Sequence, residues 1–197
     1  TVDIVEGMLW AAGGSIPGVP ANPTPARVVN LSIGGPGECT TFEQDAFDEA
    51  LSRGALVVVS AGNDNDNADG YSPASCYGVS TVVATDPYGY RASYSNYSAY
   101  ADISAPGGDS SRYTETDGVL STVDTSSSAP SGNYAYDWKN GTSMAAPHVT
   151  GVGSLMLSVN SSLTPSQMKG IMADTSSYFA SDSVCRTQEN CGAGIVN

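Results

Sequence analysis

Apolar positions along the chain follow two patterns: continuous runs typical of buried strands, and spacings of three or four typical of helices. The clearest strand is the run 55–61, whose nearly continuous apolar character indicates burial on both faces of a parallel sheet. Further strands are predicted at 27–33, 79–84, 102–105 and 119–123. Helices are predicted at 2–12, 42–53, 143–159 and 164–173. This alternation predicts an α/β fold with a doubly wound, mainly parallel sheet flanked by helices.

The length of 197 residues suits one α/β domain with a full core and is too short for two ordinary domains. Three stretches rich in polar residues, Gly or Pro are predicted to be loops: 13–25, most of 110–140, and 181–197. The loop 110–140 is expected to surround one short strand, and the tail is expected to be held by its close cysteine pair.

Charge and cysteine content limit the possible partners and the compartment. Twenty acidic residues against seven basic ones give a net charge of −13, which disfavours binding to nucleic acid or to an anionic membrane. The four cysteines lack CxxC spacing, so we interpret them as two disulfides, Cys39–Cys76 and Cys185–Cys191, although two other pairings are possible. Disulfides indicate an oxidising setting and therefore a secreted, extracellular protein. The start at Thr1 without a Met indicates a processed or cut piece.

A candidate nucleophile lies in the stretch 140–149, where a Gly, a Thr and a Ser open the predicted helix. A helix start offers unpaired backbone N–H groups and the positive end of the helix dipole. Both favour a hydroxyl whose attack creates negative charge, so Ser143 is a candidate nucleophile. The small apolar residues at 149–159 predict that this helix is buried. The alternative is a Thr142–Ser143 pair that only caps a core helix.

Asn63 directly follows the strand 55–61, and sites in parallel sheets form beyond the carboxyl ends of the strands. Its side-chain amide and the N–H of Ser143 could together bind an oxyanion, the alternative being an ordinary turn residue. No general base is present, because the single His, His148, lies five residues after Ser143 and therefore about 140° around the helix. We interpret His148 as a structural residue whose imidazole bonds a backbone group.

The segments 29–35, 59–63, 71–75 and 140–149 resemble motifs of the subtilisin-like serine proteases (subtilases) in sequence, order and spacing. The resemblance extends from about Asp3 to the end of the chain. It covers the carboxyl-terminal two thirds of a subtilase catalytic domain, so a single, partial domain is expected over residues 1–197.

The resemblance implies that Ser143 is the nucleophile and that Asn63 donates a hydrogen bond to the oxyanion. It also implies a substrate pocket, in which Gly34 and Gly35 let a substrate strand pair with the backbone. The residues that the resemblance assigns to this pocket are Ser32, Ile33, Gly34, Gly35, Ser60, Ala61, Gly62 and Tyr71.

The catalytic Asp and His of a subtilase, and the first three strands of its sheet, would lie upstream of Thr1. The sheet is therefore expected to lack its amino-terminal strands, leaving the strand 27–33 with an open edge. The resemblance implies a secreted endopeptidase acting on polypeptides, with this chain inactive unless its own amino-terminal segment supplies Asp and His. One alternative is a noncatalytic subtilase-like domain that binds peptides through Gly34 and Gly35. Another is an unrelated α/β hydrolase, but the Gly-x-Ser-x-Gly motif of that class is absent around Ser143.

Subtilases also bind structural Ca²⁺, and one common site uses two backbone carbonyls and a later Asp. These ligands correspond here to Tyr77, Val79 and Asp102, which offer the hard oxygen atoms that Ca²⁺ prefers. The alternative is that Asp102 is a strand residue without a metal. The acidic residues at 64, 66 and 69 are predicted to form a solvated loop.

Overall fold

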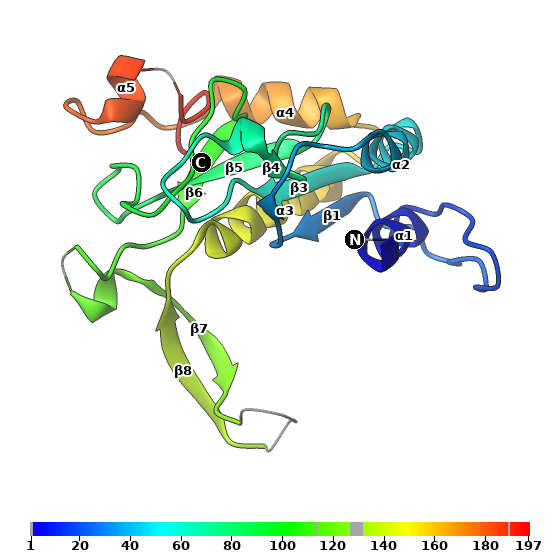
Figure 1. The fold of residues 1–197 in the computed structure, drawn as a ribbon, viewed down its shortest axis with the longest axis horizontal. Coiled ribbons are helices and arrows are strands. Elements are labelled where there is room, and N and C mark those ends of the chain that lie inside the picture. Colours follow the sequence, from blue (N-terminus) through cyan, green and yellow to red (C-terminus); the bar gives the residue numbers. More distant parts are fainter. Residues whose placement is uncertain (1, 113, 127–131, 189) are drawn as a thin grey trace.

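The structure is a computed structural model, and it describes residues 2–112, 114–126, 132–188 and 190–197. Its centre is a four-stranded sheet in the order β1-β3-β5-β6, in which every neighbouring pair is parallel (Figure 1). The strands are β1 (Val28–Leu31), β3 (Leu56–Ser60), β5 (Ser80–Thr85) and β6 (Ile103–Pro106). The predicted α/β fold with a mainly parallel sheet is confirmed.

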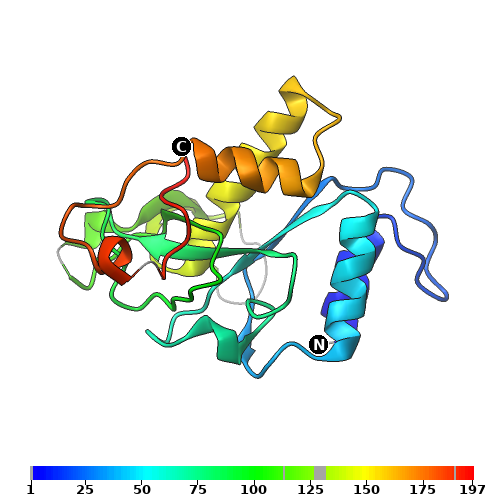
Figure 2. The same ribbon diagram turned by 90° about the horizontal axis from the view of Figure 1, so that it is seen from above.

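Helices cover both faces of this sheet. They are α1 (Val2–Ala11), α2 (Thr41–Ser52), α3 (Thr142–Val159) and α4 (Pro165–Asp174). α1 and α2 lie side by side on one face, where Val57 and Val59 of β3 pack against them (Figure 2). α3 and α4 lie on the other face with Leu56 and Val58. Because successive strand residues point to opposite faces, β3 has to be apolar at each of these positions.

The helix starts follow from capping residues in the sequence. The Thr40 hydroxyl accepts from the backbone N–H of Glu43 at the start of α2, and the Glu43 side chain accepts from the Thr40 N–H in return. α4 has the same capping box between Thr164 and Gln167, with Pro165 at its first position. The observed bounds therefore lie close to the predicted ones.

The stretch 110–140 differs from the prediction, which had one short strand in a loop. It contains an antiparallel hairpin of β7 (Val119–Asp124) and β8 (Tyr134–Lys139) that projects from the body of the molecule (Figure 1). Tyr134 and Tyr136 of β8 are 81% and 75% exposed. The strand was missed because its apolar residues pair across a hairpin rather than entering the core, so they form no buried run.

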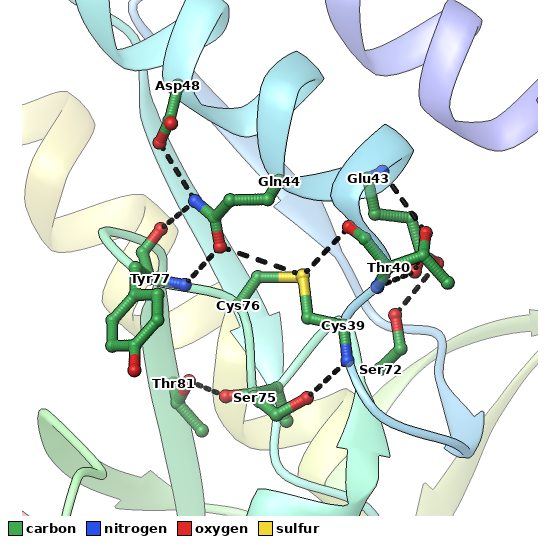
Figure 3. Close-up of a disulfide and its surroundings, with 11 residues drawn as sticks. Cys39, Thr40, Glu43, Gln44, Asp48, Ser72, Ser75, Cys76, Tyr77 and Thr81 are labelled. Carbon is green, nitrogen blue, oxygen red and sulfur yellow. Dashed lines mark hydrogen bonds between the residues drawn. A yellow bond between two sulfur atoms is a disulfide. The ribbon is translucent and has the colours of Figure 1, made fainter.

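Several short elements complete the fold. They are the strands β2 (Gly35–Pro36) and β4 (Tyr71–Ser72), the 3₁₀ helices η1 (Ala68–Gly70) and η2 (Glu115–Asp117), and the helix α5 (Val184–Gln188). α5 lies inside the tail that was predicted to be a loop. Both predicted disulfides, Cys39–Cys76 and Cys185–Cys191, are confirmed, and the first of them is shown in Figure 3.

One edge of the sheet and one face of a helix are not covered by other described residues. Among the described strands only β3 pairs with β1, so β1 is an edge strand as expected. α3 is buried along Ala145, Ala146 and Val149, but Leu155 and Val159 are 69% and 89% exposed. The prediction of a buried helix therefore holds only for the face toward the sheet, and the opposite face is exposed. In the described part of the chain, no helix is long and apolar enough to cross a membrane.

Candidate active site

Ser143 lies in the first turn of α3, against the residue that follows β1. Its Oγ donates a hydrogen bond to the carbonyl of Ser32 at 3.2 Å, and Ser32 Oγ donates to the carbonyl of Ser143 at 2.8 Å. Gly141 precedes the helix with a φ of 153°, a conformation that L side chains rarely adopt. The two hydrogen bonds with Ser32, directly after β1, thus hold the half-buried Ser143 in place at the start of α3.

Asn63 reaches the same helix start from the carboxyl end of β3. Its Oδ1 accepts hydrogen bonds from the backbone N–H and the hydroxyl of Thr142, both at 2.9 Å. Because the Thr142 N–H can only donate, the atom facing it must be the amide oxygen, which also fixes the direction of Nδ2. A Cβ built on Gly141 would lie 3.5 Å from Ser143 N and 3.8 Å from Asn63 Nδ2. Both nitrogens therefore border one space beside the start of α3.

The two segments predicted to flank the substrate pocket lie next to each other. Ser60 Oγ donates to the carbonyl of Ile33 at 3.5 Å, which joins the end of β3 to the residues after β1. The N–H of Gly62 donates to the Thr142 hydroxyl at 3.2 Å. A Cβ on Gly62 would lie 3.6 Å from the ring of Tyr71. The structure therefore brings the predicted pocket residues together at the carboxyl ends of β1 and β3.

Asn96 is a fully buried side chain whose role the sequence pattern did not indicate. Its Nδ2 donates to the carbonyl of Ala61 at 3.1 Å. Its Oδ1 accepts from the N–H groups of Asp64 and Asp66 at 2.9 and 3.0 Å. Asn96 thus holds the turn that carries Asn63. Its bonds span 30 to 35 residues, so no local pattern could have identified it.

Tyr71 lies beside this turn and keeps 9% of its surface exposed. Its hydroxyl donates to Asp66 Oδ2 at 3.4 Å. Burial and the carboxylates of Asp64 and Asp66 raise the pKa of Tyr71, so the phenol remains a neutral hydrogen-bond donor at neutral pH.

A groove of about 460 Å³ runs beside Gly34 and Gly35. Gly35 pairs with Ser72 in the short β2–β4 ladder, and a Cβ on Gly34 would come to 3.0 Å from the Ser72 carbonyl. The walls of the groove include the apolar side chains of Ile4 and Phe47. This arrangement places an apolar groove next to backbone that is crowded at Gly34 and open at Gly35.

His148 has the structural role that its position in the sequence predicts. Its Nδ1 bonds the carbonyl of Met144 at 2.8 Å, one turn earlier on α3, and its ring is exposed. The Ser143 hydroxyl bonds Ser32 instead. The structure therefore offers His148 no path to act as the base for Ser143.

The three oxygens that the resemblance assigns to calcium each accept from a protein donor. The Tyr77 carbonyl accepts from Gln44 Nε2 at 3.2 Å (Figure 3). Lys169 Nζ lies 2.9 Å from the Val79 carbonyl and 2.6 Å from Asp102 Oδ1. Because an ammonium group already bonds two of the three ligands, this arrangement does not fit a Ca²⁺ ion. Elsewhere in the described residues, no group of three or more His, Cys, Asp or Glu could hold a metal ion.

Comparison with known proteins identifies the family. The sequence matches the subtilase family over residues 1–194. It is 44% identical over 196 residues to an extracellular protease of Xanthomonas campestris pv. campestris, and 43% identical over 199 residues to an extracellular basic protease of Dichelobacter nodosus. The structure is similar to that of a protease from Pseudoalteromonas arctica, with a TM-score of 0.92 and 44% identity.

The chain therefore belongs to the subtilase family. The alignments with the Xanthomonas and Dichelobacter proteins cover 99% of this chain and 31% of each relative, so the chain spans about a third of their length. The Pseudoalteromonas comparison covers 99% of this chain and 56% of that chain.

Proposed function

We propose that this chain carries the nucleophile and the oxyanion-binding groups of a secreted serine endopeptidase. The observation that carries the proposal is the common space bordered by Ser143 N and Asn63 Nδ2, at the helix start that holds the Ser143 hydroxyl. Family membership supports a serine peptidase, and the names of the relatives support an extracellular one. The two disulfides support the same compartment.

In the proposed reaction, Ser143 Oγ gives up its bond to Ser32 and attacks the carbonyl carbon of a peptide bond while a base takes the hydroxyl proton. The carbonyl oxygen becomes an oxyanion, to which Ser143 N and Asn63 Nδ2 donate. The C–N bond then breaks, and the base returns the proton to the leaving amine. Water hydrolyses the acyl-enzyme in a second passage through the same steps.

The general base and its orienting Asp are proposed to come from an amino-terminal segment outside residues 1–197. Within these residues the only His is His148, which bonds its own helix. The open edge of β1 is a place where a further strand could pair. The exposed Leu155 and Val159 of α3 could be covered by the same segment. Residues 1–197 alone are accordingly expected to hydrolyse peptides negligibly. Turnover that a serine-directed phosphonate blocks would contradict this expectation.

The proposed substrate is a polypeptide in extended form. The backbone at Gly34 and Gly35 is proposed to pair with it, which supports recognition through main-chain hydrogen bonds. The apolar groove beside these glycines is proposed to receive a substrate side chain. The net charge of −13 argues against nucleic acid or an anionic membrane as a partner.

Labelling of the full-length protein with a fluorophosphonate tests the identity of the nucleophile. We expect one labelled serine, Ser143, and loss of labelling in Ser143→Ala. Ser158→Ala is a control at an exposed serine near the other end of α3, and it should label normally. Labelling of Ser143→Ala at the wild-type level would overturn the assignment.

Asn63→Asp separates oxyanion binding from the structural role of Asn63. The substituted carboxylate can still accept from Thr142, but it replaces the Nδ2 donor by a negative oxygen. We expect kcat to fall by roughly 10²–10³-fold, the usual loss for one oxyanion donor, with the thermal midpoint nearly unchanged. Unchanged kcat would remove Asn63 from the proposed oxyanion site.

The alternative function is peptide binding without hydrolysis. It predicts that the full-length protein binds extended peptides, that Ser143→Ala leaves this binding unchanged, and that no acyl-enzyme forms with an ester substrate. A burst of product equal to the enzyme concentration would show that an acyl-enzyme forms, and it would therefore favour the peptidase over the peptide-binding domain.

A further inference from the structure

Lys169 of α4 reaches into a cleft of about 440 Å³ between α4, the loop before β5 and the start of β6. Its Nζ lies 2.6 Å from Asp102 Oδ1 and 2.9 Å from the Val79 carbonyl, with the Gly78 carbonyl at 3.5 Å. These oxygens come from two separate segments of the chain. A single positive group therefore joins the helix to both.

The contacts around Lys169 resemble those of a small cation in an oxygen cage. An ammonium group has three N–H donors and is a compact point charge, and three oxygens surround it here. The side chains of Lys169 and Asp102 are only 25% and 24% exposed. Lys169 therefore balances the charge of Asp102 at a partly buried position. Loss of the ammonium group there would lower the free energy of unfolding, because it would leave the carboxylate without its partner.

The neighbouring groups are also bonded within the protein. Asp102 Oδ2 accepts from the N–H of Thr81 at 2.9 Å. Gln44 bonds both the N–H and the carbonyl of Tyr77, at 2.8 and 3.2 Å (Figure 3). With Lys169 in place, the oxygens of this cleft are therefore already satisfied, and a divalent ion would have to displace the ammonium.

We propose that Lys169 is a built-in cation that replaces a divalent metal ion at this place, and that removal of its charge converts the cleft into a Ca²⁺ site. Without Lys169, Asp102 Oδ1 and the carbonyls of Val79 and Gly78 face the cleft with a net negative charge. Hard carboxylate and carbonyl oxygens are the ligands that Ca²⁺ prefers, and water can complete its shell.

Thermal unfolding of the full-length protein with EDTA or with added Ca²⁺ tests the proposal. Lys169→Ala should unfold at a lower temperature in EDTA than the wild type. Ca²⁺ should raise its midpoint by roughly 3–6 °C when present at about ten times a Kd on the order of 10⁻³ M. Lys139→Ala is the matched control, because Lys139 pairs with Asp137 in an exposed setting. It should show the same Ca²⁺ response as the wild type.

Two further variants locate the effect at this cleft. Asp102→Asn added to Lys169→Ala should abolish the additional Ca²⁺ response, and Lys169→Arg should not acquire it. Terbium gives a direct readout, because the exposed Tyr77 and Tyr100 line the cleft and can sensitise its emission. Sensitised emission should be higher in Lys169→Ala than in the wild type and should fall when Ca²⁺ is added.

The proposal is overturned if Ca²⁺ stabilises the wild type and Asp102→Asn removes that stabilisation, since the native cleft would then hold the metal. It is equally overturned if Lys169→Ala folds but acquires neither the Ca²⁺ response nor the terbium signal.

Discussion

Replacement of Glu43 measures how strongly one buried carboxylate joins α2 to β4. Glu43 keeps 7% of its surface exposed. Its Oε2 accepts from the N–H and the hydroxyl of Thr40 at 2.9 and 2.8 Å, and its Oε1 accepts from Ser72 Oγ at 2.8 Å (Figure 3). One side chain thus completes the capping box of α2 and bonds a residue of β4.

We expect Glu43→Ala to lower the free energy of unfolding by about 3 kcal/mol. Loss of the cap costs about 1 kcal/mol, and the donors left without a partner cost about 1–3 kcal/mol more. Glu43→Gln should cost only about 1 kcal/mol, because its amide oxygen can accept from Thr40 while Ser72 Oγ rotates to accept from the amide. The control Glu49→Ala removes an exposed ion pair between this residue of α2 and the C-cap residue Arg53, worth about 0.5 kcal/mol.

The contribution of Glu43 to the free energy of unfolding is expected to decrease as the pH falls. Burial raises the pKa of Glu43, but the hydrogen bonds from Thr40 and Ser72 outweigh it and hold the pKa below its ordinary value of 4.5. A lowered folded-state pKa contributes stability above the unfolded value, and this contribution is lost as pH falls through the folded pKa.

Urea unfolding followed by circular dichroism, at pH 7 and in steps to about pH 3, measures both effects. The difference in free energy of unfolding between wild type and Glu43→Gln should shrink as the pH falls. The reasoning is wrong if the free energy of unfolding of Glu43→Ala lies within about 0.5 kcal/mol of the wild-type value at pH 7. It is also wrong if the difference between wild type and Glu43→Gln is the same at both ends of the pH range.

Arg27 donates to three backbone carbonyls in two loops, at 2.8–3.1 Å. Arg27→Met should therefore lower the free energy of unfolding by about 2 kcal/mol in urea melts, and a loss as small as that of a surface substitution would contradict this. The disulfides should differ in their effects because Cys39–Cys76 spans 37 residues and Cys185–Cys191 spans six. On chain entropy, replacing each pair by Ala should cost about 4 and about 2 kcal/mol respectively, so equal losses would argue against an entropic origin.

The main elements could be predicted because their signals are local. The run 55–61 is apolar at nearly every position, and β3 is buried on both faces as this requires. The start of α4 is marked within four residues, by the capping box of Thr164 and Gln167 and by Pro165 at the first helical position. The hairpin of β7 and β8 was predicted only in part, because the exposed Tyr134 and Tyr136 of β8 pair with β7 and do not enter the core. An alternation of aromatic residues at 134, 136 and 138 was the signal available for β8.

The order of the main strands and helices and the candidate nucleophile were accessible from the amino-acid sequence, because short-range spacing reports burial, capping and motif identity. The site contacts were not accessible. Ser143 bonds Ser32 across 111 residues, and Asn63 bonds Thr142 across 79. Lys169 looks like an ordinary surface residue of a helix until packing sets it 2.6 Å from Asp102. Such pairs depend on how the helices dock on the sheet, which no local pattern encodes.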